Sequence, residues 1–294
     1  MSEAEDDRGR GRRITLTLIR HGESVDNLSH RWAGVKDSDL SNHGFNQAQS
    51  LSEYFKKKSI RFTKIYCSDL QRARLTAQSV SNNQLQQSSK TKPKDSQKND
   101  DEDDEESFLQ VLPILREQNF GIAEGKPWNS GEFEFSTKFF TERDIGFKDG
   151  ESLNQVFGRA KRFFEDVIIS KYLSNYSSDT QELKGSDLDK KSEEEDEVNI
   201  CIVSHGIFLA EFINVLKSMA DRLEGPKIMS EMSNTGWTKI QLDSFYPSST
   251  SSPSISMRVL ITNHTDHLTD LTRQPGGIGS SKYDPKQSKL DSFF

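Results

Sequence analysis

The sequence lacks long apolar runs and is poor in hydrophobic residues, which make up 32% of its 294 positions. No segment approaches the roughly 20 consecutive apolar residues that cross a bilayer. The start of the chain, MSEAEDDRGRGRR, also lacks the apolar segment of a secretory signal. We therefore expect a protein without a membrane partner that resides in the cytoplasm, with the nucleus as a second location.

Cysteine is scarce as well, because the chain has two, Cys67 and Cys201, each inside a predicted strand. Two buried thiols favour reduced core residues over a disulfide framework or a metal cluster. The six histidines form no recognisable ligand set, and His264 and His267 lie three apart without an HExxH arrangement, so we expect them to be loop or rim residues. No glycine-rich phosphate loop follows any predicted strand. We expect no metal and no other cofactor.

Negative charge is abundant but concentrated, since the net charge of −7 includes uninterrupted acidic runs at residues 100–106 and 193–197. The remainder of the chain is mildly basic, which suits an anionic substrate. Polar, highly charged segments without aromatic residues are typical of disorder. We predict a disordered arm over residues 1–13, one domain over 14–272 with disordered insertions at about 81–107 and 174–197, and a disordered tail over 273–294.

Strand-like and helix-like segments alternate along the remaining sequence. Short apolar, β-branched runs predict strands, whereas apolar residues at helical spacing predict helices. This alternation favours an α/β fold, a single domain with a mainly parallel sheet flanked by helices. The predicted strands are Ile14–Ile19, Lys64–Ser68, Phe108–Leu112, Val198–Ser204, Gly236–Leu242 and Met257–Thr262, and the predicted helices are Phe45–Phe55, Asp69–Val80, Glu151–Leu173 and Ile207–Met219.

Chemically capable side chains follow two of these strands. Arg20 and His21 end the first one, and His205 with Gly206 ends another strongly apolar strand. The carboxyl ends of parallel strands meet at one edge of an open α/β sheet, where ligands bind. A single histidine is more often a core or surface residue, but two at equivalent strand ends indicate a shared site.

Two further stretches carry an arginine and a carboxylate in suitable contexts. Arg72 lies in the first turn of a predicted helix, where a guanidinium and the helix dipole can clamp a phosphate. Arg74, two residues later, faces another direction and is predicted to lie at the surface. Glu117 lies in LREQNFGIAEG, and Glu124 of the same stretch, next to a turn glycine, is interpreted as structural.

The run RHGE at residues 20–23, with Asn27 after it, resembles the signature of the histidine phosphatase superfamily, the phosphoglycerate mutase-like family. The stretches CSDLQRARLTA and LREQNFGIAEG are similar to further motifs of that family. The resemblance implies a phosphohistidine on His21, a proton donor at Glu117, and a catalytic set completed by Arg20, Arg72 and His205. It also implies phosphate binding by Arg20, Asn27, Gly34, Arg72, Glu117, His205 and Gly206.

Within this superfamily the chain looks most like the TIGAR-type fructose-2,6-bisphosphatases. The similar stretches are EGKPW, DGESLNQVFGRAKRFFE, SNTGWTKI and NHTDHLTDL. Mutases of the family carry a paired arginine for a second phosphate, whereas residues 129–147 contain only Lys138 and an isolated Arg143.

The resemblance therefore implies a metal-independent phosphatase acting on a small phosphorylated metabolite, fructose-2,6-bisphosphate or another sugar phosphate. The alternatives are a phosphoglycerate mutase and a non-catalytic scaffold. Plausible rim residues that could select the substrate are Arg31, Trp32, Lys36, Lys126 and Trp128.

The two ends of the chain suggest different partners. The basic RGRGRR segment is interpreted as a flexible arm, and we expect no direct nucleic-acid binding. The terminal octapeptide QSKLDSFF resembles the box by which proteins dock on the sliding clamp, proliferating cell nuclear antigen. The alternative is that the tail folds back onto the domain. The residues that would contact the clamp are Gln287, Leu290, Phe293 and Phe294.

Overall fold

One mixed sheet of seven strands organises the chain, in the order β3-β2-β4-β1-β6-β7-β5. The computed structural model describes residues 12–88, 107–128, 142–173, 198–228, 231–245, 254–284 and 286. The strands are β1 (Arg13–Arg20), β2 (Lys64–Cys67), β3 (Leu109–Val111), β4 (Val198–Ser204), β5 (Arg222–Glu224), β6 (Trp237–Phe245) and β7 (Ser254–His264). The main helices are α1 (Val25–Leu28), α2 (Asn42–Lys57), α3 (Gln71–Ser88), α5 (Leu153–Phe163) and α6 (Gly206–Met219).

The sheet is mainly parallel, as predicted. The neighbours β2/β3, β2/β4, β1/β4 and β5/β7 run parallel, whereas β1/β6 and β6/β7 are antiparallel. Strand β1 lies between β4 and β6, and its residues Ile14–Ile19 are all buried, because a central strand covered on both faces excludes water from every side chain. The fold class predicted from the sequence is therefore confirmed.

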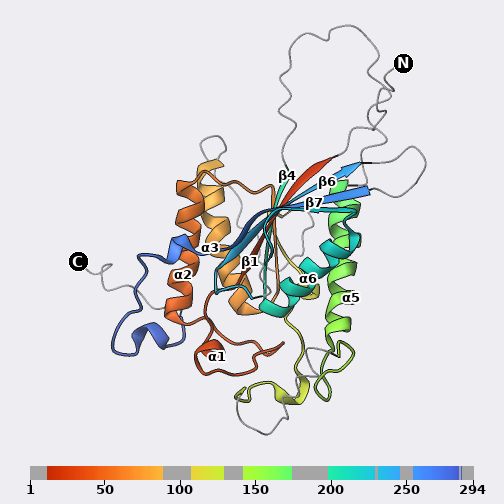
Figure 1. The fold of residues 1–294 in the computed structure, drawn as a ribbon. Helices are drawn as coiled ribbons and strands as arrows, with labels where there is room; N and C mark the ends of the chain where they lie inside the picture. The colour runs from red at the N-terminus through yellow and green to blue at the C-terminus, as the bar shows by residue number, and fades with distance from the viewer. Residues whose placement is uncertain are drawn as a thin grey trace, which may run out of the picture.

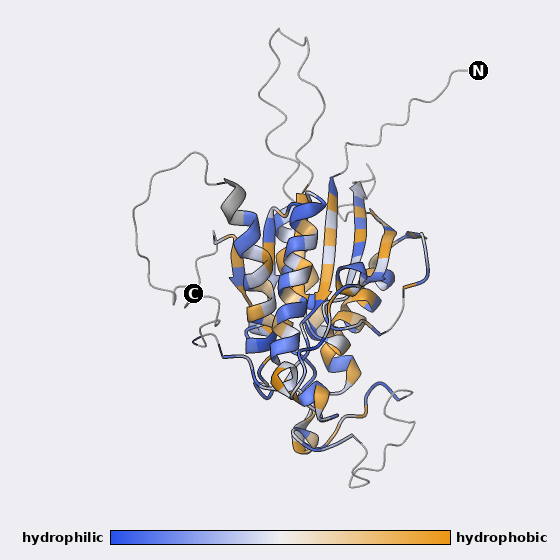
Figure 2. Cartoon of the chain, turned by 90° about the vertical axis from the view of Figure 1, so that its left-hand side faces the viewer, coloured by the Kyte–Doolittle hydropathy of each residue, from blue (hydrophilic) through white to orange (hydrophobic). Residues whose placement is uncertain are grey.

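Helices cover both faces of the sheet. Helices α2 and α3 lie on one face, and α5 and α6 lie on the other (Figure 1). Figure 2, viewed from the side of α2 and α3, shows mainly hydrophilic residues on the helices and hydrophobic residues along the strands. Two large apolar clusters result, one containing Phe163, Phe164 and Phe212 and the other containing Phe55 and Trp237. Each helix buries its apolar stripe against the strands, which is the main stabilisation of such a layered fold.

Several elements follow the sequence prediction closely. The predicted helix over 151–173 is α5, capped by Ser152, which continues as the π-helical segment η4 (Phe164–Leu173). Both cysteines are buried and free, as predicted. Strand β5 was not predicted, since three residues at the sheet edge carry no periodic signal. Within the described ranges, no helix is long and apolar enough to cross a membrane.

The sequence prediction places the start of the first insertion too early in the chain. Helix α3 continues to Ser88, so residues 81–88 are helical rather than disordered. Ser81 and Gln84 are buried, and the Gln84 amide donates to the Ile60 carbonyl at 3.0 Å. The Asn83 amide donates to Ser52 Oγ at 2.8 Å. These polar side chains can be buried because they form hydrogen bonds with a neighbouring helix and loop. A prediction based on apolar residues alone does not detect such a helical segment.

The predicted arm and tail are also shorter than expected. Arg13 already belongs to β1, and its guanidinium bonds to Asp243 at 2.6 Å. Residues 273–284 are placed against the domain, because Tyr283 stacks on Phe45 with ring centroids 3.8 Å apart and Arg273 pairs with Glu23. The segment includes a short helix, η6 (Ile278–Ser280). The predictions for residues 1–11, 89–106 and 174–197, and for the clamp-binding residues Gln287, Leu290, Phe293 and Phe294, lie outside the described residues.

Candidate active site

The pairing register of the central strands brings the two strand-end histidines together. Arg20 of β1 pairs with Ser204 of β4, so His21 and His205 leave neighbouring parallel strands at the same level. Their ring centroids are 5.0 Å apart. The backbone N–H of His21 donates to the Ser204 carbonyl at 3.0 Å, which extends the ladder by one residue. The convergence expected from the sequence is therefore present.

The His21 imidazole is fixed in one orientation. Its Nδ1 lies 2.7 Å from the Gly22 carbonyl oxygen. A carbonyl can only accept, so Nδ1 carries the proton and Nε2 keeps its lone pair. Burial lowers the pKa of His21 well below its usual value, and the nearby charges of Arg72 and Arg20 lower it further. The neutral form, with a nucleophilic Nε2, is the one this environment favours.

His205 occupies a deeper position than the sequence suggested. Its side chain is fully buried, and among the described residues neither ring nitrogen has a hydrogen-bond partner. Burial and the neighbouring Arg72 and His21 lower its pKa well below the usual value. His205 does not line the pocket described below, although Gly206 does. Its ring lies beside that of His21, and its place among the phosphate-contacting residues stays a prediction.

Two arginines approach His21 from different elements. Arg72, in the first turn of α3, is 1% exposed and donates to the carbonyls of Gly34 and Lys36 at 2.7 and 3.0 Å. Arg20 donates from Nη1 to the Met232 carbonyl at 2.7 Å. The Nε atoms of both arginines are buried and have no partner within the described chain. Arg74 is exposed, as predicted. Buried donors without acceptors are costly, so these guanidinium groups are arranged for an anion.

Glu117 is anchored at the start of α6. Its Oε1 accepts from the backbone N–H of Gln118 at 3.0 Å and of Phe208 at 3.1 Å, and its Oε2 accepts from Ile207 at 3.3 Å. The positive end of the helix dipole adds to this stabilisation of a carboxylate. An ideal Cβ on Gly206 would lie 3.8 Å from both Glu117 Oε2 and Arg20 Nε. The acid and the guanidinium therefore face each other across Gly206.

The loop that holds Arg72 depends on Glu124. The Glu124 carboxylate accepts from the backbone N–H groups of Val35 at 2.9 Å, Lys36 at 3.0 Å and Phe120 at 3.1 Å. Gly34 has a φ of +55°, and a Cβ there would overlap this carboxylate. Glu124 is thus structural, as predicted, and Gly34 is required by backbone conformation and by close packing.

The signature turn is tied down by residues that sequence reasoning left without a role. The Asn234 amide donates to the His21 carbonyl at 3.0 Å and to Asn27 Oδ1 at 3.2 Å. The Thr235 N–H donates to the Arg20 carbonyl at 3.0 Å, and Thr235 Oγ1 lies 2.9 Å from His267 Nε2. His267 is therefore buried and structural, not the loop or rim residue that was predicted.

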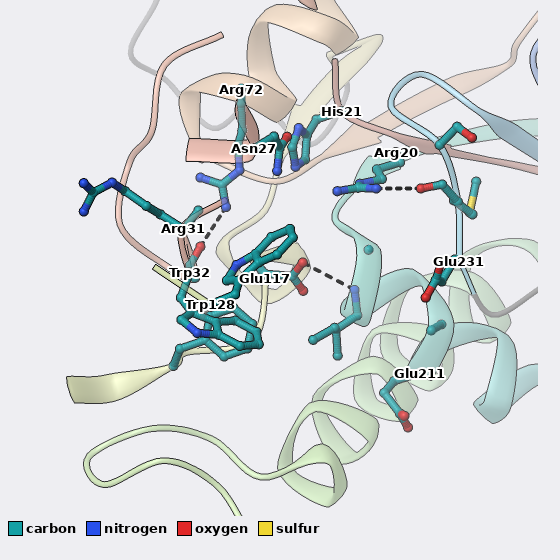
Figure 3. A pocket seen from close by; sticks show the side chains of 18 of the residues that line it. Arg20, His21, Asn27, Arg31, Trp32, Arg72, Glu117, Trp128, Glu211 and Glu231 are labelled. Atoms are coloured by element: carbon teal, nitrogen blue, oxygen red, sulfur yellow. Dashed lines mark hydrogen bonds between the residues drawn. The ribbon is translucent and has the colours of Figure 1, made fainter. Parts of the chain in front are cut away.

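A cavity of about 790 Å³ opens beside these groups. Figure 3 shows Arg72, His21 and Arg20 along one side of it. Glu211 and Glu231 lie across from Arg72, and Trp128 lies below Trp32, near the lower margin of the pocket. We call Arg20, His21, Asn27, Gly34 and Arg72 the basic end. We call Glu211 and Glu231, together with the further lining residues Trp128, Leu153 and Ala210, the acidic end. Both ends line one pocket.

The predicted rim residues divide into two groups. Arg31, Trp32 and Trp128 line the pocket, whereas Lys36 and Lys126 are not among its lining residues. The acidic end was not predicted, because isolated glutamates on a helix and a loop carry no motif. Within the described chain, no group of three or more His, Cys, Asp or Glu side chains is placed to hold a metal ion.

Comparisons with known proteins point in one direction. The family model of the histidine phosphatase superfamily (branch 1) matches residues 16–93. A zebrafish (Danio rerio) protein named fructose-2,6-bisphosphatase TIGAR B is 29% identical over 203 residues, 67% of this chain and 72% of that protein. A Xenopus laevis protein named fructose-2,6-bisphosphatase TIGAR is 33% identical over 157 residues, which cover 52% of this chain but only 49% of the frog protein.

A solved structure shares the fold. The native structure of a mycobacterial glucosyl-3-phosphoglycerate phosphatase superposes with a TM-score of 0.58 at 21% identity, covering 86% of this chain and 99% of the other. The chain therefore has the phosphoglycerate mutase-like fold.

Proposed function

This chain belongs to the histidine phosphatase superfamily as a phosphoric monoester hydrolase, and we propose that it cleaves a small phosphorylated sugar through a phosphohistidine on His21. One observation carries the proposal. A neutral imidazole with a fixed tautomer lies between two buried guanidinium groups, with a carboxylate on the other side of Gly206. This is the constellation that an in-line phosphoryl transfer needs.

In the proposed first step, His21 Nε2 attacks phosphorus and the bond from phosphorus to the ester oxygen breaks. Arg20, Arg72 and Asn27 bind the three equatorial oxygens, where negative charge is spread in the transition state. Glu117 gives its proton to the departing alkoxide. The backbone N–H groups of Ile207 and Phe208 hold the Glu117 carboxyl group in place for this step, and the proton that it donates enters with the phosphate monoester.

In the second step, water attacks the phosphohistidine and the bond from nitrogen to phosphorus breaks. The Glu117 carboxylate takes a proton from that water, which restores both residues for another cycle. The two guanidinium groups would supply the positive field that a divalent cation supplies in other phosphoryl-transfer sites. We therefore propose that turnover continues in the presence of a chelator.

The experiment is a substrate panel with a trapping step. Phosphate release is measured with EDTA on phosphorylated sugars, phosphoglycerates, phosphopeptides and acetyl phosphate, and ³²P-labelled substrate is quenched to detect protein-bound phosphate. We expect release from sugar phosphates and an acid-labile, alkali-stable label that His21→Ala lacks. A coupled assay for phosphoglycerate isomerisation distinguishes a mutase. Absence of both label and turnover on the whole panel would contradict the proposed function.

A further inference from the structure

The basic end has no spare cation for a second phosphate on the substrate. Arg72 and the Nε atom of Arg20 are buried near His21, and in the proposed mechanism both guanidinium groups bind the same phosphate. Arg31 is the remaining cation among the described lining residues, and it donates to the Gly125 carbonyl at 2.6 Å. Figure 3 shows its guanidinium directed away from His21 and Glu117.

Arg143 is also unavailable, although it lies in the segment where a second phosphate would be held in a mutase. Its guanidinium makes a two-pronged ion pair with Glu211, with Nη1 3.1 Å from Oε1 and Nη2 bonded to Oε2. The Glu211 side chain is only 5% exposed. Breaking this pair would leave a buried carboxylate without its cation, which is costly. The pair therefore presents no net positive charge to a ligand.

Glu231 adds an uncompensated negative charge at the acidic end. It lines the pocket, is exposed, and is near enough to Arg20 to raise the pKa of that guanidinium against the effect of burial. Within the described residues it has no hydrogen bond or ion pair. A second phosphate placed here would meet a like charge, whereas a hydroxyl group could donate to the carboxylate.

An indole surface completes the acidic end. Trp128 is 47% exposed and lies 5.9 Å from the Trp32 ring and 5.6 Å from the His30 ring. Leu153 and Ala210 line the pocket nearby. A pocket lined by an exposed indole and by a carboxylate acceptor suits a ring with one apolar face and several hydroxyl groups, since it offers stacking area and hydrogen bonding.

Resting on the proposed function, we propose that the acidic end is a carbohydrate subsite for an uncharged, hydroxyl-rich leaving group. Glu231 accepts hydrogen bonds from hydroxyl groups there, Trp128 stacks on the sugar, and the Glu231 carboxylate discriminates against a second phosphate. The substrate is then a sugar monophosphate rather than a bisphosphate. The cavity of about 790 Å³ has room for a monosaccharide and for a second sugar unit.

Matched substrate pairs test the proposal. The ratio of kcat/KM is measured for glucose 6-phosphate against glucose 1,6-bisphosphate and for fructose 6-phosphate against fructose 1,6-bisphosphate, with fructose-2,6-bisphosphate added. We expect the monophosphate to be preferred about tenfold or more. Within each variant, a change at the basic end affects kcat/KM for both substrates alike and cancels in the ratio. The ratio therefore reports on the acidic end alone.

A charge series at Glu231 supplies the critical readout. Glu231→Gln should lower the monophosphate preference several-fold, and Glu231→Lys should lower it further or invert it, because the charge changes in equal steps. The differences should shrink as salt is added. Glu53→Gln, on the exposed side of α2, is the matched control and should leave the ratio unchanged. A role of Glu231 in folding alone would not order the ratio by charge.

The stacking surface is tested separately. Trp128→Ala should raise the KM for glucose 6-phosphate about five- to tenfold, and Trp128→Phe should restore most of the loss. The subsite proposal is overturned if acetyl phosphate turnover and the His21 label persist but bisphosphates are hydrolysed as efficiently as monophosphates. It is also overturned if the ratio does not change across the Glu231 series. Loss of that turnover and that label as well, in the wild-type protein, would instead mean that the proposed function is wrong.

Discussion

The two ends of the pocket differ in how their side chains are held. At the basic end Arg72 is bonded to two carbonyls, His21 to one, and the nearby Glu117 to three backbone N–H groups. At the acidic end Glu211 is held by Arg143, but Trp128 is half-exposed and Glu231 is exposed without a partner among the described residues. Preorganised groups suit a reaction whose geometry is fixed, whereas exposed groups suit adaptation to a leaving group. The difference assigns chemistry to one end and selectivity to the other.

The substitution His21→Ala tests this assignment with the largest expected effect. Removing the nucleophile should lower kcat by about 10⁴-fold or more on every substrate, since among the lining residues of the basic end His21 is the one histidine. Steady-state phosphate release measures it. His43→Ala, on α2, is the control and should retain wild-type activity. A His21→Ala protein that still turned over sugar phosphates rapidly would show that the reaction is not confined to this end.

Glu117→Gln should give the next largest effect, and its size should depend on the leaving group. A sugar alkoxide needs a proton as it departs, so kcat on glucose 6-phosphate should fall about 10²- to 10³-fold. Acetate leaves without one, and acetyl phosphate should lose less than about tenfold. The measurement is kcat for both substrates in the wild type and the variant. Equal losses on the two would place Glu117 in binding or folding instead of proton transfer.

Two glycines beside the catalytic groups test the comparison further, because the structure predicts different consequences when each is replaced by alanine. Gly34→Ala forces a left-handed φ of +55° on alanine and displaces the Glu124 carboxylate, so it should cost about 2 kcal/mol of unfolding free energy and weaken Arg72. Gly206→Ala meets nothing closer than 3.8 Å. It should leave stability within about 0.5 kcal/mol and lower kcat/KM about three- to tenfold by crowding the phosphate.

Denaturant unfolding and acetyl phosphate kinetics distinguish the two variants. If both glycines cost stability alike, or if Gly206→Ala is as active as wild type, then Gly206 does not border the phosphate. The first result would also mean that the space seen around Gly206 is filled in solution.

The same contrast explains what the sequence could predict. Arg20, His21 and Arg72 lie at a strand end and a helix start, where local patterns and the sheet edge together determine position, whereas Glu117 was predicted from the resemblance of its stretch to a family motif. Glu211 and Glu231 owe their roles to where α6 and a loop happen to pack, and no spacing in the sequence encodes that. Element types were predictable because their apolar periodicity is strong, whereas the end of α3 was not, since Asn83 and Gln84 are held there by hydrogen bonds of their side-chain amides.

His205 and His267 show a second limit of sequence reasoning. A strand-end histidine can be placed at a site from its position, but its depth follows from packing that only the fold reveals. His205 is buried beside His21, and His267, which sequence reasoning assigned to a loop or rim, is bonded to Thr235 under the signature turn. The basic end therefore rests on a layer of polar residues whose own contacts are buried.

The smallest expected effect is a pH dependence of the free energy of unfolding, which tests that supporting layer. Burial and the neighbouring His264 together lower the pKa of His267 to about 4, against the opposing charge of Asp266. The unfolded chain has an ordinary histidine pKa of about 6.5, so between these values the unfolded state binds more protons. Stability is thus fully present above pH 6.5 and is lost as pH falls toward 4, by about 1 to 3 kcal/mol.

Urea unfolding between pH 7.5 and 4 measures this loss in the wild type and in His267→Gln. The glutamine amide can still donate to Thr235 Oγ1, whose own proton goes to the Asn234 carbonyl, but it does not titrate. Because His21 and His205 are buried neutral in both proteins, their shared pH dependence cancels in the difference between the two curves. His30→Gln, at an exposed position, should follow the wild-type curve. Parallel curves for His267→Gln and the wild type would mean that His267 is solvated, and that the basic end does not depend on a buried layer beneath it.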